Sequence, residues 1–167
     1  MDVFMEKIVV KRKNIKDYAL SVLLVVAALV VFIALSFIPL ISGFMPVVII
    51  GVGYGLYRLL QSRNIEFEYI VTNGDLDIDR IIAQRKRKRI FSASCKDFDI
   101  VAKYDCLNPP TQVQNVPKRI DAISSMDSGD IYYLIVNYKT EKTAVLFEPD
   151  ERMLNSFKTF IPRKVVL

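Results

Sequence analysis

The densest group of reactive side chains in the sequence is a run of five consecutive cations, Arg85, Lys86, Arg87, Lys88 and Arg89. Beside an anionic leaflet, each basic residue of such a run contributes about 1 kcal/mol of binding free energy. The run therefore predicts a contact with anionic lipid or with an acidic partner. Charge runs are also common on solvated surfaces, where these cations would pair with nearby acids such as Asp75, Asp77, Asp79 and Glu66.

Catalytic and metal-binding chemistry find little support in the residue types. The chain has no histidine, which excludes histidine-activated nucleophiles, histidine metal ligands and histidine proton shuttles. The aspartates at 75, 77 and 79 resemble the opening of a calcium loop, but Arg80 stands where that loop needs glycine and Lys86 where it needs a bidentate glutamate. We therefore predict no catalytic residue, no metal site, no cofactor and no enzymatic activity.

A glycine-rich string, Gly51-Val52-Gly53-Tyr54-Gly55, resembles the end of a potassium-channel selectivity filter. A filter needs a pore helix before it and a lining helix after it, whereas charged Arg58 follows here. Gly51 and Gly55 are four residues apart, on one face of a helix, where small residues let another helix approach closely. The approaching helix is either the preceding apolar segment of the same chain or one from a neighbouring copy.

The elements that carry these residues fall into two classes, because 52% of the chain is hydrophobic while 25% is charged. From Tyr18 to Tyr57 no side chain is charged. As a helix this stretch would be about 60 Å long, roughly twice the hydrocarbon thickness of a bilayer. We therefore predict a two-helix transmembrane hairpin over residues 18–60.

The middle of this stretch favours a reversal of the chain. Two prolines, Pro39 and Pro46, enclose a serine and a glycine. Proline interrupts helices and glycine permits a tight turn, so the two spans are predicted near 18–38 and 44–60.

Basic residues flank both ends of the predicted hairpin, at Lys7, Lys11, Arg12, Lys13, Lys16, Arg58 and Arg63. The connecting turn carries no charge, so the positive-inside rule places both flanks in the cytoplasm. We predict a multi-pass protein of the cell (plasma) membrane with both termini cytoplasmic. Residues 1–17 would be a basic cytoplasmic segment, either a short amphipathic helix at the interface or a frayed tail.

Residues 64–167 have the pattern of a mainly-β cytoplasmic domain. Apolar and polar residues alternate on both sides of Asn73-Gly74, a two-residue hairpin signal. Further strands are predicted near 88–94, 98–103 and 120–123, and a second hairpin joins 131–138 to 143–147. Between Pro149 and Pro162, apolar residues recur at helical spacing, so one amphipathic helix closes the domain.

About four strands, a proline-rich loop, about three more strands and a terminal helix follow one another in an order that resembles a pleckstrin-homology-like (PH-like) domain. The apolar hairpin followed by Glu68-Tyr69-Ile70-Val71-Thr72-Asn73-Gly74-Asp75-Leu76 is similar to small bacterial membrane-anchored PH-like proteins. The resemblance implies a membrane α-helical hairpin plus a PH-like β-barrel or roll of about seven strands with a C-terminal capping helix. It also implies a binding or assembly role.

Two functional hypotheses follow. In the first, the chain is a membrane-tethered binding or scaffold module that contacts membrane lipids through the run from Arg85 to Arg89. In the second, it is a non-catalytic structural or accessory subunit that associates with another membrane protein or with itself. Nucleic acid is not a predicted partner, because the 18 basic and 15 acidic residues after residue 57 leave only +3 on the β domain.

Overall fold

The computed structural model describes residues 4–166 of the chain, with the side chain of Ser42 left out. Residues 12–64 form one compact unit. The residues up to Lys11 form a second compact unit together with those from Ile65 onward. The second unit is therefore assembled from two parts of the chain that flank the first. The first three residues of the predicted N-terminal segment, and the last residue of the chain, lie outside the described residues.

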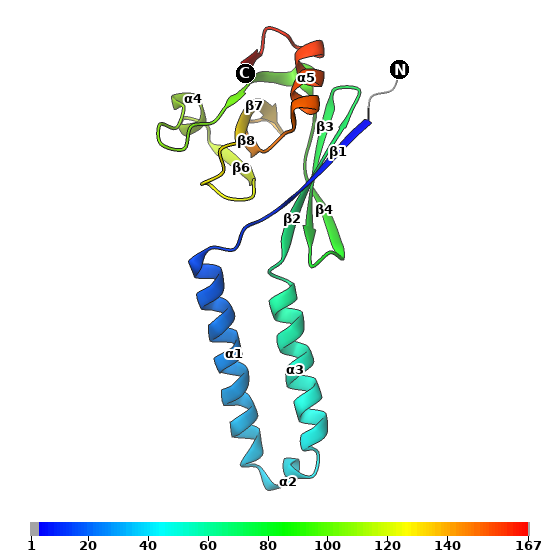
Figure 1. Cartoon of the computed structure of the whole chain (residues 1–167), viewed down its shortest axis with the longest axis vertical. Helices are drawn as coiled ribbons and strands as arrows, with labels where there is room; N and C mark the ends of the chain where they lie inside the picture. Colours follow the sequence, from blue (N-terminus) through cyan, green and yellow to red (C-terminus); the bar gives the residue numbers. More distant parts are fainter. Residues whose placement is uncertain (1–3, 167) are drawn as a thin grey trace. The chain divides into compact units, whose positions relative to one another are not determined.

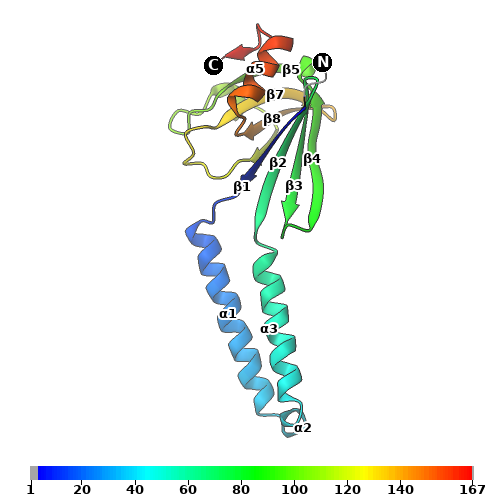
Figure 2. The ribbon, with the colours of Figure 1, turned by 45° about the vertical axis from the view of Figure 1, so that its right-hand side comes forward.

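The unit of residues 12–64 is a helical hairpin (Figures 1 and 2). It contains α1 (Ile15–Ser36), α2 (Pro39–Ser42) and α3 (Met45–Gln61), and α1 lies beside α3. At the start of α1, the backbone N–H of Asn14 donates a 3.1 Å hydrogen bond to the Asp17 carboxylate, which caps the helix. An ion pair between Arg63 and Asp17 joins the two open ends of the hairpin.

Within the described part of the chain, no residue of α1 or α3 is buried, although both helices are strongly apolar. Exposed apolar surface of this extent is unfavourable in water and matches the hydrocarbon of a bilayer. Among the described residues, α1 is the one helix long and apolar enough to cross a membrane, while α3 has only 17 residues. The expected membrane helix is thus supported for α1, and a second crossing by α3 stays a prediction.

The other unit consists of two sheets, a 3-10 turn and two helices. The first sheet is antiparallel, in the order β1 (Phe4–Val10), β2 (Ile65–Thr72), β3 (Asp75–Ile82) and β4 (Lys86–Ser94). The second has the order β6 (Lys118–Ala122), β8 (Glu141–Phe147), β7 (Tyr132–Tyr138), β5 (Phe98–Lys103) and β9 (Val165–Val166). A 3-10 turn, η1 (Cys95–Asp97), joins the two sheets, α4 (Thr111–Gln114) follows β5, and α5 (Glu151–Phe160) follows β8.

The mainly-β class and the closing helix are confirmed, and the expected count of about seven strands in a barrel or roll is corrected. The described residues hold nine strands in two separate sheets, which do not close into a barrel. The additional strands are β1 and the two-residue β9. The interfacial helix or frayed tail expected for the N-terminal segment is wrong for the described residues. They form strand β1, which pairs with β2 from Phe4↔Thr72 to Val10↔Glu66.

Both predicted hairpins are present. Asn73 and Gly74 have φ values of 52° and 90°, the left-handed conformation that a two-residue hairpin turn requires. A Cβ at position 74 would lie 2.9 Å from the Cys95 sulfur, so glycine is needed there for space as well as for φ. The second turn is shorter than expected, since it contains only Lys139 and Thr140, again with positive φ.

One apolar core lies between the inner faces of the two sheets and α5. Tyr69 of β2, Phe147 of β8 and Phe157 of α5 are fully buried, and neighbouring rings meet edge to face at 6.0 and 6.4 Å. The Asp150 carboxylate accepts a 2.7 Å hydrogen bond from the backbone N–H of Met153, which caps α5 and holds it over the core.

The Tyr69 hydroxyl connects the two sheets inside this core. It donates to the backbone carbonyl of Ala122 and accepts from the backbone N–H of Glu148 at 3.2 Å. Burial raises the pKa of Tyr69, so the hydroxyl stays protonated and available as a donor.

Tyr69→Phe should therefore destabilise the β unit by about 1–3 kcal/mol, because it leaves a buried carbonyl and a buried N–H without a partner. Urea unfolding of the full chain in detergent, followed by near-ultraviolet circular dichroism, measures the loss. Tyr132→Phe is the matched control, since the Tyr132 hydroxyl forms no hydrogen bond within residues 4–166. Equal unfolding free energies for the two variants would contradict the bridging role.

Candidate anion-binding groove

The predicted run of five cations is divided by the fold. Arg85 lies in the turn between β3 and β4, and the other four residues begin β4. Along a strand, successive side chains point to opposite faces. Arg87 and Lys88 therefore face different surroundings, and the five cations do not form one continuous surface.

Two members of the run are held by acids. The Arg87 guanidinium donates to Glu68 at 2.9 Å, and that of Arg89 donates to Asp77 at 2.6 Å and to Asp79 at 2.8 Å. Pairing of the run with nearby acids, the alternative to lipid contact, thus holds for these two arginines. Asp77 and Asp79 are among the expected partners, whereas Glu68 was not expected and Asp75 and Glu66 form no ion pair with the run among the described residues.

Glu68 and Asp79 are both buried on this face, with 2% and 4% of their surfaces exposed. Burial and the neighbouring Glu6 carboxyl raise the pKa of Glu68, and the Arg87 charge opposes that rise. The partly exposed Arg87 therefore neutralises a carboxylate that would otherwise be costly to bury. This engagement makes Arg87 a structural residue.

Lys88 forms no ion pair among the described residues and lines a groove of about 470 Å³ between the two sheets. Seven cations line it, contributed by the end of β1, β3, β4, β6 and the turn after β7: Lys11, Arg80, Lys88, Arg89, Lys118, Arg119 and Lys139. Its apolar lining consists of Ile65, Phe67, Ile90, Ile120 and Tyr138. We call this cavity the basic groove.

The basic groove has a large excess of positive charge. Its one acid, Asp121, is held by Arg119 at 2.6 Å, and Arg89 is occupied by the β3 aspartates. The five remaining cations form no ion pair within the described residues: Lys11, Arg80, Lys88, Lys118 and Lys139. Like charges gathered around one cavity repel one another, and a bound anion relieves that repulsion.

Arg80 is the most informative of these cations. It occupies the strand position that continues the buried series of Leu76 and Ile78 on β3, so its side chain extends from the core face into the groove. Its Nε is buried and has no hydrogen-bond partner in the described part of the chain. The guanidinium charge of Arg80 is thus not balanced by an acid in the described residues, and a bound anion in the groove would balance it.

Two of the five predicted lipid-contact residues, Lys88 and Arg89, thus line the groove, while Arg85, Lys86 and Arg87 do not. Sequence reasoning missed the cations at 11, 80, 118, 119 and 139, which come from segments far apart in the chain. A usable signal was the arginine that interrupts the apolar alternation of β3.

The glycines proposed for helix packing, Gly51 and Gly55, belong to the helical unit. A Cβ at Gly51 or Gly55 would meet no atom within 4 Å. The space beside these two glycines is therefore open. Packing against the preceding apolar segment and packing against a neighbouring copy both stay predictions.

Comparison with known proteins gives one result. The model of a family described as a bacterial PH-like domain (DUF6106) matches residues 1–167. Neither a curated protein nor a solved structure matches the chain.

Proposed function

The chain belongs to the bacterial PH-like domain family, and from this membership and the basic groove we propose that it is a membrane-tethered binding module for anionic lipid headgroups. The role is one of binding or scaffolding, without catalysis. The observation that carries the proposal is a group of five cations around one cavity that form no ion pair within residues 4–166, among them Arg80 with its buried Nε.

The chemistry of the groove favours a lipid over a free anion. Its cations suit a phosphate, to which an arginine and several lysines contribute charge-assisted hydrogen bonds. Phe67, Ile90 and Tyr138 line the same cavity and suit the apolar part of a molecule attached to that phosphate. An inorganic phosphate ion would use only the cations.

The chain path supports a position close to the membrane. Lys11, which lines the groove, precedes the first residue of α1 by four positions, and Ile65 follows the last residue of α3 by four. Four residues span at most about 14 Å. If α1 crosses the bilayer, these short connections keep Lys11 and Ile65 within about 14 Å of the helix ends that enter it.

The pairing of β1 with β2 supports an even number of membrane crossings. The Lys11 N–H donates to the Ile65 carbonyl at 2.9 Å, so the chain leaves this sheet and returns to it at the same place. A chain that crosses in α1 must cross again to reach β2. With the basic flanks, this return supports a multi-pass protein of the plasma membrane with both termini in the cytoplasm.

A second candidate function, a structural subunit of a larger membrane complex, has one observation in its favour. The face of α3 that carries Gly51 and Gly55 is open, and glycine inside a helix costs about 1 kcal/mol relative to alanine. A helix from another membrane protein or from a second copy would use that face for close packing. In this case the groove would not need to bind lipid.

The test uses the full chain in nanodiscs of zwitterionic phosphatidylcholine, titrated with dihexanoyl phosphatidylglycerol and followed by NMR. Lys118→Glu with Lys139→Glu should weaken binding about 100-fold, because two favourable contacts of about 1 kcal/mol each become repulsive. Arg85→Glu with Lys86→Glu changes the net charge equally outside the groove. This control pair should weaken binding less than about threefold, since exposed charges act through screened interactions.

Several outcomes of this titration would count against the proposal. Equal losses in the two charge-reversed pairs would indicate general electrostatic attraction and no groove. Equally tight binding of inorganic phosphate would contradict the choice of a lipid. Absence of binding to the unmodified chain would favour the structural-subunit candidate.

A further inference from the structure

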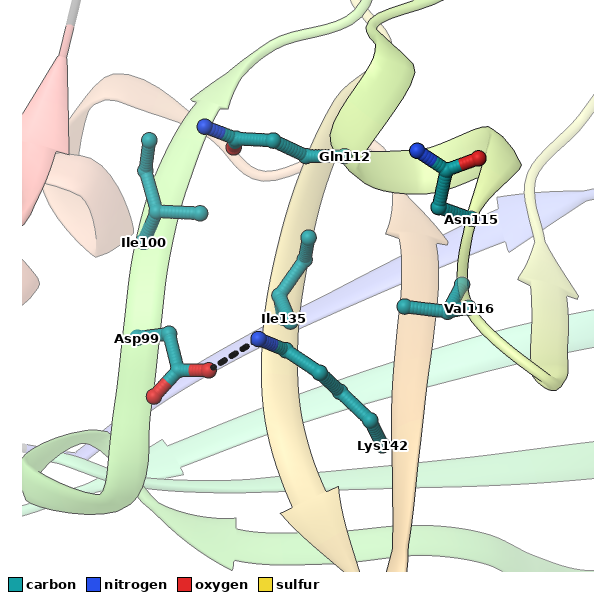
Figure 3. A pocket seen from close by; sticks show the side chains of 7 residues that line it. All are labelled: Asp99, Ile100, Gln112, Asn115, Val116, Ile135 and Lys142. Atoms are coloured by element: carbon teal, nitrogen blue, oxygen red, sulfur yellow. Dashed lines mark ion pairs between the residues drawn. The ribbon is translucent and has the colours of Figure 1, made fainter.

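A second cavity, of about 390 Å³, lies on the outer face of the second sheet, and its lining differs completely from that of the basic groove. In Figure 3, the side chains of the other lining residues surround Ile135 of β7. They are Asp99 and Ile100 of β5, Gln112 of α4, Asn115 and Val116 just after α4, and Lys142 of β8. We call this cavity the outer pocket.

Two local features build the outer pocket. The register of β5 against β7 shifts between Phe98 and Ile100, so Asp99 is an extra residue in the strand. Such a bulge redirects side chains, and both Asp99 and Ile100 line the pocket. On the other side, the segment carrying α4 is anchored by Val113, which is buried in the apolar cluster on this face of the sheet.

The floor of the outer pocket is the surface of that cluster, where Ile135 is nearly covered and Ile100 and Val116 are partly exposed. Ile135 belongs to the cluster, and Ile100 and Val116 pack against it. All three are branched aliphatic side chains, and the cavity above them is large enough for another of the same kind. An aliphatic side chain from outside would complete the packing.

The rim of the outer pocket carries hydrogen-bonding capacity without net charge. Asp99 and Lys142 neutralise each other at 3.3 Å. The Gln112 carboxamide accepts from the Tyr133 hydroxyl at 3.3 Å and keeps its NH₂ group free, and the Asn115 carboxamide forms no hydrogen bond within residues 4–166. Free amide donors and acceptors beside an aliphatic floor complement a peptide backbone with an aliphatic side chain.

We propose that the outer pocket binds an extended segment of a partner protein, with a leucine-like side chain on Ile100, Val116 and Ile135 and its flanking peptide groups hydrogen-bonded to Gln112 and Asn115. The neutral rim excludes the phosphate-bearing ligands that the basic groove selects. The outer pocket gives the β unit a protein-binding site independent of its lipid-binding one, and the two sites share no lining residue.

The probe is N-acetyl-leucine amide, titrated into the full chain in phosphatidylcholine nanodiscs with methyl-labelled isoleucine and valine. From its size we expect a Kd of about 1–5 mM, with saturable NMR shifts at Ile100, Val116 and Ile135. Gln112→Ala with Asn115→Ala should weaken binding at least about fivefold per lost hydrogen bond, because both side chains are exposed and the fold is retained. Asn155→Ala, an exposed amide on α5, is the matched control and should leave Kd unchanged.

The matched ligands decide between alternatives. N-acetyl-glycine amide keeps the peptide groups without the side chain and should bind at least about tenfold more weakly. Free leucine, whose charged ends replace the two amides, should also bind more weakly. Equal binding of either ligand, shifts outside the outer pocket, or no shift at about 20 mM probe would overturn the proposal. The lipid titration is unaffected by these results.

Discussion

Replacing residues 12–64 with an Asn-Gly turn should convert the chain into a water-soluble β domain that keeps both sheets. The Lys11 N–H donates to the Ile65 carbonyl at 2.9 Å, and the residues next to them, Val10 and Glu66, are paired across β1 and β2. Lys11 and Ile65 therefore occupy the hydrogen-bonded positions that a two-residue turn closes. The graft removes the apolar helices and restores a continuous hairpin.

Starting the chain at residue 64 should have the opposite result, because it removes β1. The buried side chain of Val9 and the hydrogen bonds along β2 are then lost, at a cost of about 3–5 kcal/mol. That cost is a large part of the roughly 5–15 kcal/mol that stabilises a typical domain. We expect this truncated domain to aggregate or to unfold at low urea concentration, while the grafted domain unfolds cooperatively.

Two substitutions in the grafted domain test the register of β1. Val9 is buried against the core with 7% of its surface exposed, whereas neighbouring Ile8 is 50% exposed on the other face. Val9→Asp should destabilise the graft by about 3 kcal/mol or more, and Ile8→Asp by less than about 1 kcal/mol. Urea titrations measure both values. A soluble, stable domain starting at residue 64, or equal effects of the two aspartates, would show that β1 is not part of the fold.

Labelling with a membrane-impermeant maleimide in intact cells should modify only the hairpin turn. In a Cys106→Ser background, we expect Leu40→Cys to be labelled from outside, because α2 joins the C-terminal end of α1 to the N-terminal end of α3. Phe4→Cys on β1 and Leu107→Cys after β5 should be labelled only after permeabilisation. All three side chains are exposed, at 84%, 64% and 90%, so access to the reagent is decided by the membrane.

Because β1 pairs with β2, positions 4 and 107 should give the same labelling result. Positions 4 and 107 belong to one folded unit, so they must lie on the same side of the membrane. The remaining cysteine, Cys95, is buried, and burial raises the pKa of its thiol, so it contributes little background. Opposite accessibility of positions 4 and 107 would mean that α1 crosses alone, and protection of position 40 would mean that the hairpin does not reach the outer surface.

Local features of the fold were predictable because their causes lie within a few residues. The uncharged stretch favours hydrocarbon wherever it is placed, and all of α1 beyond its first turn lies within it. Asn73-Gly74 adopts a turn because these two residues accept positive φ, and α5 combines an Asp150 cap with an apolar stripe. In each case the preference is a property of the segment itself.

Tertiary structure alone decided which distant segments meet. Strand β1 has an alternating pattern, but its partner β2 follows only after residues 12–64, and no local pattern encodes a pairing over that distance. The same holds for the basic groove, where Arg80, Lys118 and Lys139 converge from three elements, while the consecutive Arg87 and Lys88 face different partners. Sequence determined the charge of each segment and its affinity for lipid or water. The packing of two sheets determined which charges remain unpaired, because ion pairing depends on distances in space between residues that are far apart in the chain.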